Sequence, residues 1–141
     1  MYKLTAQKPF DEHDLQVWIV NFLRFHHFYC FAIPNGGRRD AKTGKKLKDE
    51  GVLAGVADLQ ILLPGGKSIF VELKTPWGYQ STAQKAFENE IKLRGFEYKI
   101  WRSDKDAKDF VQSFKDYNVQ TKGAGGLILD ANAPTFQGLR K

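Results

Sequence analysis

The segment GVADLQILLPGGKSIFVELKT, residues 55–75, decides the fold. It contains two runs rich in aliphatic and β-branched residues, 56–63 and 68–75, which are separated by Pro64-Gly65-Gly66-Lys67. Runs of this composition are typical of strands, and a short connection containing proline and glycine is typical of a hairpin turn. The segment therefore predicts a β-hairpin at the centre of a sheet.

Two acidic residues of this hairpin are predicted to face each other. A register that pairs Leu62 with Ser68 through a five-residue loop places Asp58 opposite Glu72. Lys74 leaves the strand on the same face as Glu72, because side chains two residues apart in a strand share a face. The other face of this strand is wholly apolar and is expected to lie in the core; it consists of Ile69, Val71 and Leu73.

Facing carboxylates repel each other, so a stable protein needs a proton or a cation between them. The chain has a single cysteine and no well-spaced histidine pair, so oxygen ligands favour Mg²⁺ or Mn²⁺ over zinc. Lys74 is expected beside the metal, where it can orient an attacking water and stabilise charge on a phosphate oxygen. Glu12, on a predicted helix, is a candidate third carboxylate. Taken alone, however, Glu-x-Lys on a strand is more often an exposed polar face.

Helices and strands are predicted on both sides of the hairpin. Asp11 can cap a helix that runs to about Phe25, and Ser81 with Gln84 forms a capping box for a helix that ends at Gly95. This cap and a contact with the site explain Gln84 equally well. The other expected elements are a strand over 28–34, a loop over 38–55, a strand over 96–102 and a helix capped by Asp104. The order α-β-β-β-α-β-α predicts an α/β fold with a mixed sheet flanked by helices.

The length of 141 residues predicts one domain, over 1–117, followed by a glycine-rich tail over 118–141 that is expected to be mobile. Hydrophobic residues make up 42% of the chain, which suffices for a core that needs no disulfide or metal to stabilise it. The single cysteine, Cys30, can form no internal disulfide. No apolar run is long enough to span a membrane, and the N-terminus lacks the apolar core of a signal peptide. A cytoplasmic protein is therefore expected.

The net charge of +6 is unevenly distributed. Residues 35–50 carry six basic and three acidic side chains, a net charge of +3, within the predicted loop. Such a loop suits DNA phosphates, although a solvated basic face is the commoner explanation of a charge run. Trp77 and Tyr79 could stack on an unpaired base or sugar, but core packing or a loop plug is the expected use of these residues. The expected DNA-binding residues are Asn35, Arg38, Arg39, Lys42, Lys45, Lys46 and Lys48.

Several motifs together resemble those of the VRR-Nuc (virus-type replication-repair nuclease) group of the PD-(D/E)XK superfamily, in particular its small phage-encoded members. The resemblance covers residues 11 to 112 approximately. It implies a restriction-endonuclease-like αβββαβ core. The residues that carry it are Glu12 with Gln16, Gly55-Val56-Ala57-Asp58, Glu72-Leu73-Lys74 and Gln84. It implies metal binding by Asp58, Glu72, the Leu73 carbonyl and Glu12, and a catalytic role for these carboxylates together with Lys74 and Gln84.

The expected function is that of a deoxyribonuclease that depends on Mg²⁺ or Mn²⁺ and hydrolyses phosphodiester bonds. The resemblance further implies a homodimer that acts on branched DNA such as Holliday junctions during phage replication, recombination or repair, in the host cytoplasm. Two alternatives remain open. A non-catalytic nucleic-acid-binding module would use the basic loop but give Asp58, Glu72 and Lys74 no reason to converge. A restriction-like nuclease with sequence preference would share the site but normally needs more recognition surface.

Overall fold

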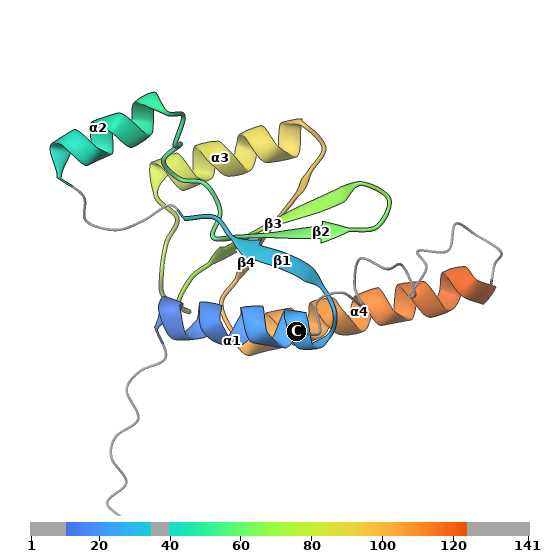
Figure 1. The fold of residues 1–141 in the computed structure, drawn as a ribbon. Helices are drawn as coiled ribbons and strands as arrows, with labels where there is room; N and C mark the ends of the chain where they lie inside the picture. Colours follow the sequence, from blue (N-terminus) through green and yellow to red (C-terminus); the bar gives the residue numbers. More distant parts are fainter. Residues whose placement is uncertain (1–10, 35–39, 124–141) are drawn as a thin grey trace, which may run out of the picture.

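The computed structural model describes residues 11–34 and 40–123, and the side chains up to residue 115. A four-stranded sheet lies between helices (Figure 1), so the expected mixed α/β architecture is confirmed. In chain order the elements are α1 (Glu12–Phe25), β1 (Tyr29–Ala32), α2 (Ala41–Asp49), β2 (Leu59–Leu63), β3 (Lys67–Leu73), α3 (Thr82–Leu93), β4 (Glu97–Trp101) and α4 (Asp104–Gly123).

The sheet has the order β1-β2-β3-β4, with both parallel and antiparallel pairs. Strands β2 and β3 form the predicted antiparallel hairpin, and Leu62 pairs with Ser68 as expected. Strand β4 pairs in parallel with β3, so that Leu73 lies beside Trp101. Because these two strands run in the same direction, the segments that follow them leave the sheet at the same edge.

The core lies between the sheet and the pair α1 and α4, which pack against each other below the sheet in Figure 1. Helix α1 begins where the Asp11 carboxylate accepts a hydrogen bond from the backbone N–H of Asp14, at 2.8 Å. Its apolar stripe packs against the apolar face of β3, as the alternation predicted. The buried residues of these elements are Leu15, Ile19, Leu23, Ile69, Val71, Leu73, Ala107 and Val111.

Helix α3 covers the other face of the sheet (Figure 1). The ring of Phe87 packs edge-on against Phe70 of β3, with ring centroids 5.6 Å apart, and also contacts Tyr98 of β4. No residue of α3 is fully buried, so this layer is thinner than the one formed by α1 and α4. The site described below lies at the edge of this thinner layer.

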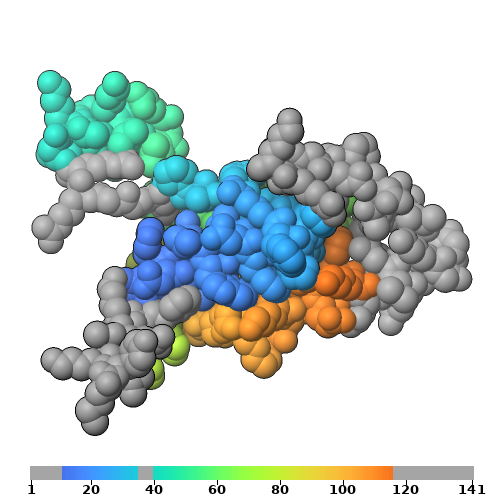
Figure 2. Space-filling view, turned by 60° about the horizontal axis from the view of Figure 1, so that its bottom comes forward, coloured from blue at the N-terminus to red at the C-terminus, as the bar shows by residue number. Residues whose placement is uncertain are grey.

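Helix α2 corrects the prediction of a loop throughout residues 38–55. The Asp40 carboxylate caps it by accepting a hydrogen bond from the backbone N–H of Thr43, at 2.6 Å. Ion pairs one turn apart join Lys45 to Asp49, at 2.7 Å, and Lys46 to Glu50, at 3.9 Å. Caps and i,i+4 pairs stabilise helices even in lysine-rich segments, and they outweigh the poor helix propensity of Gly44. No residue of α2 is buried, and the helix projects from the body of the molecule (Figure 2).

Helix α4 also differs from expectation at both ends. Asp104 is its first residue rather than the residue that caps it, and the helix continues to Gly123, past the expected start of the tail at 118. The predicted tail therefore begins in helix, and residues 124–141 lie outside the described part of the chain. Among the helices described, none has the length and apolar character that crossing a membrane requires.

Candidate active site

Asp58 lies where the chain enters β2, next to the end of β3. Its Oδ2 accepts a hydrogen bond from the backbone N–H of Leu73, at 2.7 Å. Its own carbonyl accepts a hydrogen bond from the backbone N–H of Ile33, at 2.9 Å. The hairpin register thus carries Asp58 to the position opposite Glu72, and two hydrogen bonds fix it there.

Glu72 is the most buried charged residue described, with 1% of its surface exposed. Its Oε1 accepts a hydrogen bond from Nε2 of Gln84, at 2.8 Å, and lies 3.4 Å from Nζ of Lys74. Its second oxygen, Oε2, is buried and has no hydrogen-bond partner within the described segments. A buried carboxylate oxygen without a partner destabilises the folded state, because it has lost its hydrogen bonds to water and no protein hydrogen bond replaces them.

The electrostatics of the pair reflect this environment. Burial, and after it the negative charge of Asp58, raise the pKa of Glu72 from its ordinary value of 4.5 to about 7. The ammonium group of Lys74 acts in the opposite direction, and is outweighed. The site therefore attracts either a proton or a cation toward Glu72.

Gln84 performs both of the roles that the sequence left open. Its Oε1 accepts a hydrogen bond from the backbone N–H of Ser81, at 2.8 Å, which completes the predicted capping box. Its Nε2 donates to Glu72, as described above. The first turn of α3 is therefore tied to the end of β3 through one side chain.

Lys74 follows β3 directly and is held in place by β4. Its backbone N–H donates to the carbonyl of Trp101, at 3.0 Å, and its side chain is 10% exposed. Beyond it, Nη1 of Arg102 donates to the carbonyls of Thr75, at 2.9 Å, and Gly78, at 2.7 Å. Arg102 was not among the predicted site residues. A single arginine after a strand carries no local signal, since its partners lie in another loop.

Gly55 fixes the path of the chain toward Asp58. Its φ is +85°, and its backbone lies so close to α3 that a Cβ atom would stand 2.4 Å from the carbonyl carbon of Ala83 and 2.7 Å from the nitrogen of Gln84. Only glycine combines this backbone conformation with this close approach. The contact sets the distance between the Asp58 segment and the first turn of α3.

Replacing Gly55 by alanine is expected to destabilise the protein by about 2 to 4 kcal/mol, because backbone strain adds to a clash with backbone atoms that cannot swing aside. Urea unfolding measures the change. Gly51→Ala is the matched control: Gly51 has a φ of +98° but no atom within 4 Å of its Cβ position, so strain alone is expected, at about 1 kcal/mol. Equal losses in the two variants would show that the close approach is unimportant.

Glu12 does not complete a set of three metal-binding carboxylates with Asp58 and Glu72 in the described part of the chain. It is exposed in the first turn of α1, which packs against the face of the sheet opposite to that of Glu72. Within the described residues, no three side chains of His, Cys, Asp or Glu are placed so that they could hold a metal ion together. The expected set of three carboxylates is therefore not formed in this structure, and Asp58 and Glu72 stand as a pair.

The predicted DNA-binding residues divide into two groups. Asn35, Arg38 and Arg39 lie outside the described residues. The lysines lie exposed on α2 rather than on a loop, and ion pairs engage two of them with acidic residues of the same segment. These lysines are Lys42, Lys45, Lys46 and Lys48.

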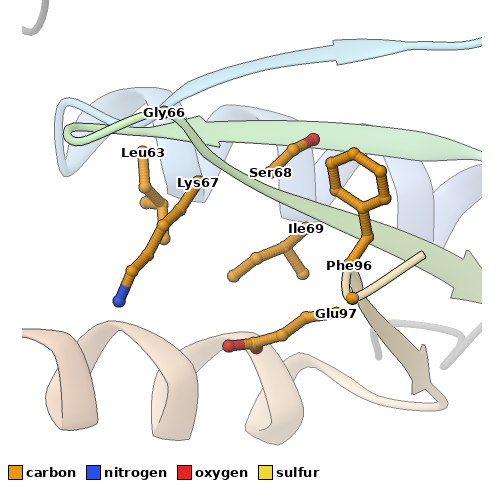
Figure 3. Close-up of a pocket in the computed structure, with 8 residues that line it drawn as sticks. Leu63, Gly66, Lys67, Ser68, Ile69, Phe96 and Glu97 are labelled. Carbon is orange, nitrogen blue, oxygen red and sulfur yellow. The ribbon is translucent and has the colours of Figure 1, made fainter. Parts of the chain in front are cut away.

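Figure 3 shows a pocket between the hairpin turn and the turn before β4. Lys67, Ser68, Phe96 and Glu97 contribute to its lining. It is located at the start of β3, whereas Glu72 lies at the end of that strand. We therefore assign it no part in the chemistry of the carboxylate pair.

Comparisons with known proteins give a consistent result for the fold. No protein-family model and no curated protein matches the chain. A solved structure described as "VRR_NUC domain protein" has a TM-score of 0.60 and 21% sequence identity, over 78% of this chain and 89% of that one. A second, described as "VRR_NUC domain", has a TM-score of 0.53 and 19% identity, over 72% of this chain and 94% of that one. The chain therefore has the restriction-endonuclease-like α/β fold of solved VRR_NUC domains, as the resemblance of its motifs implied.

Proposed function

We propose that this protein is a deoxyribonuclease that depends on Mg²⁺ or Mn²⁺ and hydrolyses phosphodiester bonds. The observation that carries the proposal is the buried Oε2 of Glu72, which has no hydrogen-bond partner in the described segments. Glu72 lies at the register position opposite Asp58. The similarity to solved VRR_NUC domains supports it at the level of fold. A binding module would have no use for such a costly arrangement.

The residues present fit a hard divalent cation. Mg²⁺ is commonly held by one or two carboxylates together with waters and substrate phosphates, and needs no complete protein cage. Asp58, Glu72 and the carbonyl of Leu73 would hold it. When bound, such a cation lowers the pKa of a coordinated water and neutralises charge on the phosphate.

The other side chains position these groups. The N–H of Leu73 and the amide of Gln84 fix one oxygen each of Asp58 and Glu72, which leaves the remaining oxygens free to bind. Lys74, held at 3.4 Å from Glu72, is placed to donate a hydrogen bond to an attacking water or to a phosphate oxygen. Its charge also favours the ionised form of Glu72 that metal binding requires.

We further propose that the substrate is branched DNA, cut by a homodimer. Lys42 and Lys48 form no ion pair within the described residues, so they are available for phosphates. Phosphate contacts draw DNA in without regard to sequence. Two sites related by a two-fold axis would meet two strands of a junction.

The test is cleavage of fluorescent linear, flapped and four-way DNA in Mg²⁺, Mn²⁺ or EDTA. We expect cutting only with a divalent metal, and faster cutting of branched than of linear DNA. Binding without cutting in every metal would identify the non-catalytic module instead. Cutting confined to one sequence in all three substrates would identify a restriction-like enzyme. Sedimentation of the same preparation reports whether the active species is a dimer.

A further inference from the structure

We propose that Trp77 and Tyr79 form a stacking surface for unpaired DNA bases beside the carboxylate pair. The inference deepens the proposed function, on which it rests, by naming the substrate feature that the site selects. We call these two residues the aromatic pair. They lie in the short segment between Lys74 and the start of α3.

The aromatic pair is unusually exposed. Trp77 is 84% exposed and Tyr79 is 89% exposed, although tryptophan is on average among the more buried residue types. The expectation that they pack in the core is therefore wrong. Large aromatic rings in water bring no stability to the folded chain, while they supply the flat apolar faces on which bases stack.

The segment that carries Trp77 is held rigidly. The carbonyl of Thr75 accepts a hydrogen bond from the N–H of Gly78, at 3.1 Å, which closes a turn with Pro76 and Trp77 at its tip. Arg102 donates to the carbonyls at both ends of the same turn. Proline fixes its own backbone angle, so the turn has little freedom left to lose when a ligand binds.

The residues on both sides of Tyr79 are also held by hydrogen bonds. Gly78 precedes it in the clamped turn, and Gln80 follows it. The amide of Gln80 donates to Oε1 of Glu88, at 3.0 Å, and to the hydroxyl of Tyr98, at 3.3 Å. Both aromatic side chains thus project from backbone that β4 and α3 hold in place.

The reach of the chain places Trp77 within a few nucleotides of the reacting phosphate. Two residues, Thr75 and Pro76, lie between Lys74 and Trp77, so the two Cα atoms are at most about 10 Å apart. Stacked nucleotides rise about 3.4 Å per step along a strand, so Trp77 can meet a base within about three nucleotides of the phosphate at Lys74. Bases inside a duplex already stack on their neighbours. A gap, flap or junction offers the free base faces that the aromatic pair can cover.

The test measures binding in EDTA, where the proposed chemistry cannot proceed. Fluorescein-labelled single-stranded, gapped and fully duplex DNA are titrated with wild type, Trp77→Ala and Tyr79→Ala. Each substitution is expected to weaken binding of single-stranded and gapped DNA by about tenfold or more, and binding of the duplex by less than about twofold. Trp77→Phe keeps an aromatic face and is expected to restore most of the affinity.

Two further measurements make the result specific. Stacking on Trp77, whose ring is far more exposed than those of Trp18 and Trp101, is expected to quench the tryptophan fluorescence when single-stranded DNA is added. Phe25→Ala is the matched control: Phe25 is 76% exposed, but it precedes β1 at the end of the sheet that is remote from Glu72. Its loss should leave all DNA affinities unchanged.

Unchanged affinity of Trp77→Ala and Tyr79→Ala for gapped DNA would overturn the stacking surface, and would leave the aromatic pair as a contact for another protein. Cleavage by wild type in Mn²⁺ would in that case still support the nuclease. Conversely, affinity that depends on Trp77, without cleavage in any metal, would sustain the stacking surface and remove the nuclease.

Discussion

Replacing Lys74 by methionine is expected to lower the rate of DNA cleavage by at least about 100-fold, since its ammonium group lies 3.4 Å from Glu72 and is placed to stabilise charge on the reacting phosphate. Asp58→Asn should cause a comparable loss. The asparagine oxygen can still accept the hydrogen bond from Leu73, so the hairpin should keep its geometry while the negative charge disappears. Single-turnover cleavage of four-way DNA in Mn²⁺ measures both effects.

The two variants are expected to differ in their response to metal alone. Mn²⁺ binds only the folded site, so it should raise the melting temperature of wild type and of Lys74→Met. Asp58→Asn has lost a ligand and should show no such shift. Equal shifts in all three proteins would place the metal elsewhere.

The chain contains a matched control for Lys74. Glu97 and Lys99 repeat the Glu-x-Lys spacing on β4, with Nζ and Oε2 3.8 Å apart, but both side chains are substantially exposed. Lys99→Met should leave the cleavage rate within about twofold of wild type. Surface ion pairs contribute little to stability, and Lys99 lies outside the proposed site. Cleavage that survived Lys74→Met, or fell equally with Lys99→Met, would remove the proposed site.

Raising the pH from 4.5 to about 8 is expected to lower the free energy of unfolding of the metal-free protein by about 3 kcal/mol through Glu72 alone. The pKa of this carboxyl is 4.5 when unfolded and about 7 when folded, so the folded protein holds the proton more tightly. Its contribution is complete below pH 4.5 and is lost as the pH rises through 7. Glu72→Gln should remove this pH dependence.

Urea unfolding in EDTA at several pH values measures the slope. Glu90→Gln, which alters an exposed carboxyl on α3, is the control and should leave the slope as it is in wild type. Added Mn²⁺ is expected to restore stability above pH 7, where the ionised Glu72 can bind it. A slope that is the same in wild type and in Glu72→Gln would show that Glu72 keeps an ordinary pKa.

The hairpin and its register could be predicted from the sequence because a short connection leaves little choice of pairing. With Leu62 set against Ser68, the meeting of Asp58 and Glu72 followed from counting residues. The capping box of α3 was equally local. Gln84 also donates a hydrogen bond to Glu72. This contact depends on how α3 packs on the sheet, which no local sequence pattern reveals.

Other parts of the prediction failed for identifiable physical reasons. Lysines and glycines between 38 and 55 suggested a loop, but the Asp40 cap and two ion pairs form α2. Glu12 was expected as a third carboxylate because it lies on the first predicted helix, and no set of three carboxylates is formed within the described residues. Spacing does not reveal which face of the sheet that helix covers. The sequence also did not reveal that Trp77 is exposed, since aromatic residues are ordinarily found in the core.

The parallel pairing of β3 and β4 has an evolutionary consequence. Since α3 returns the chain to the same edge of the sheet, one continuous stretch, 55–102, supplies the carboxylate pair, the lysine, the glutamine and the arginine clamp. Helices α1, α2 and α4 contribute none of these groups. Selection can therefore rewrite the surrounding helices while it preserves this one inherited unit, so lineages can drift far apart in sequence and retain a common architecture.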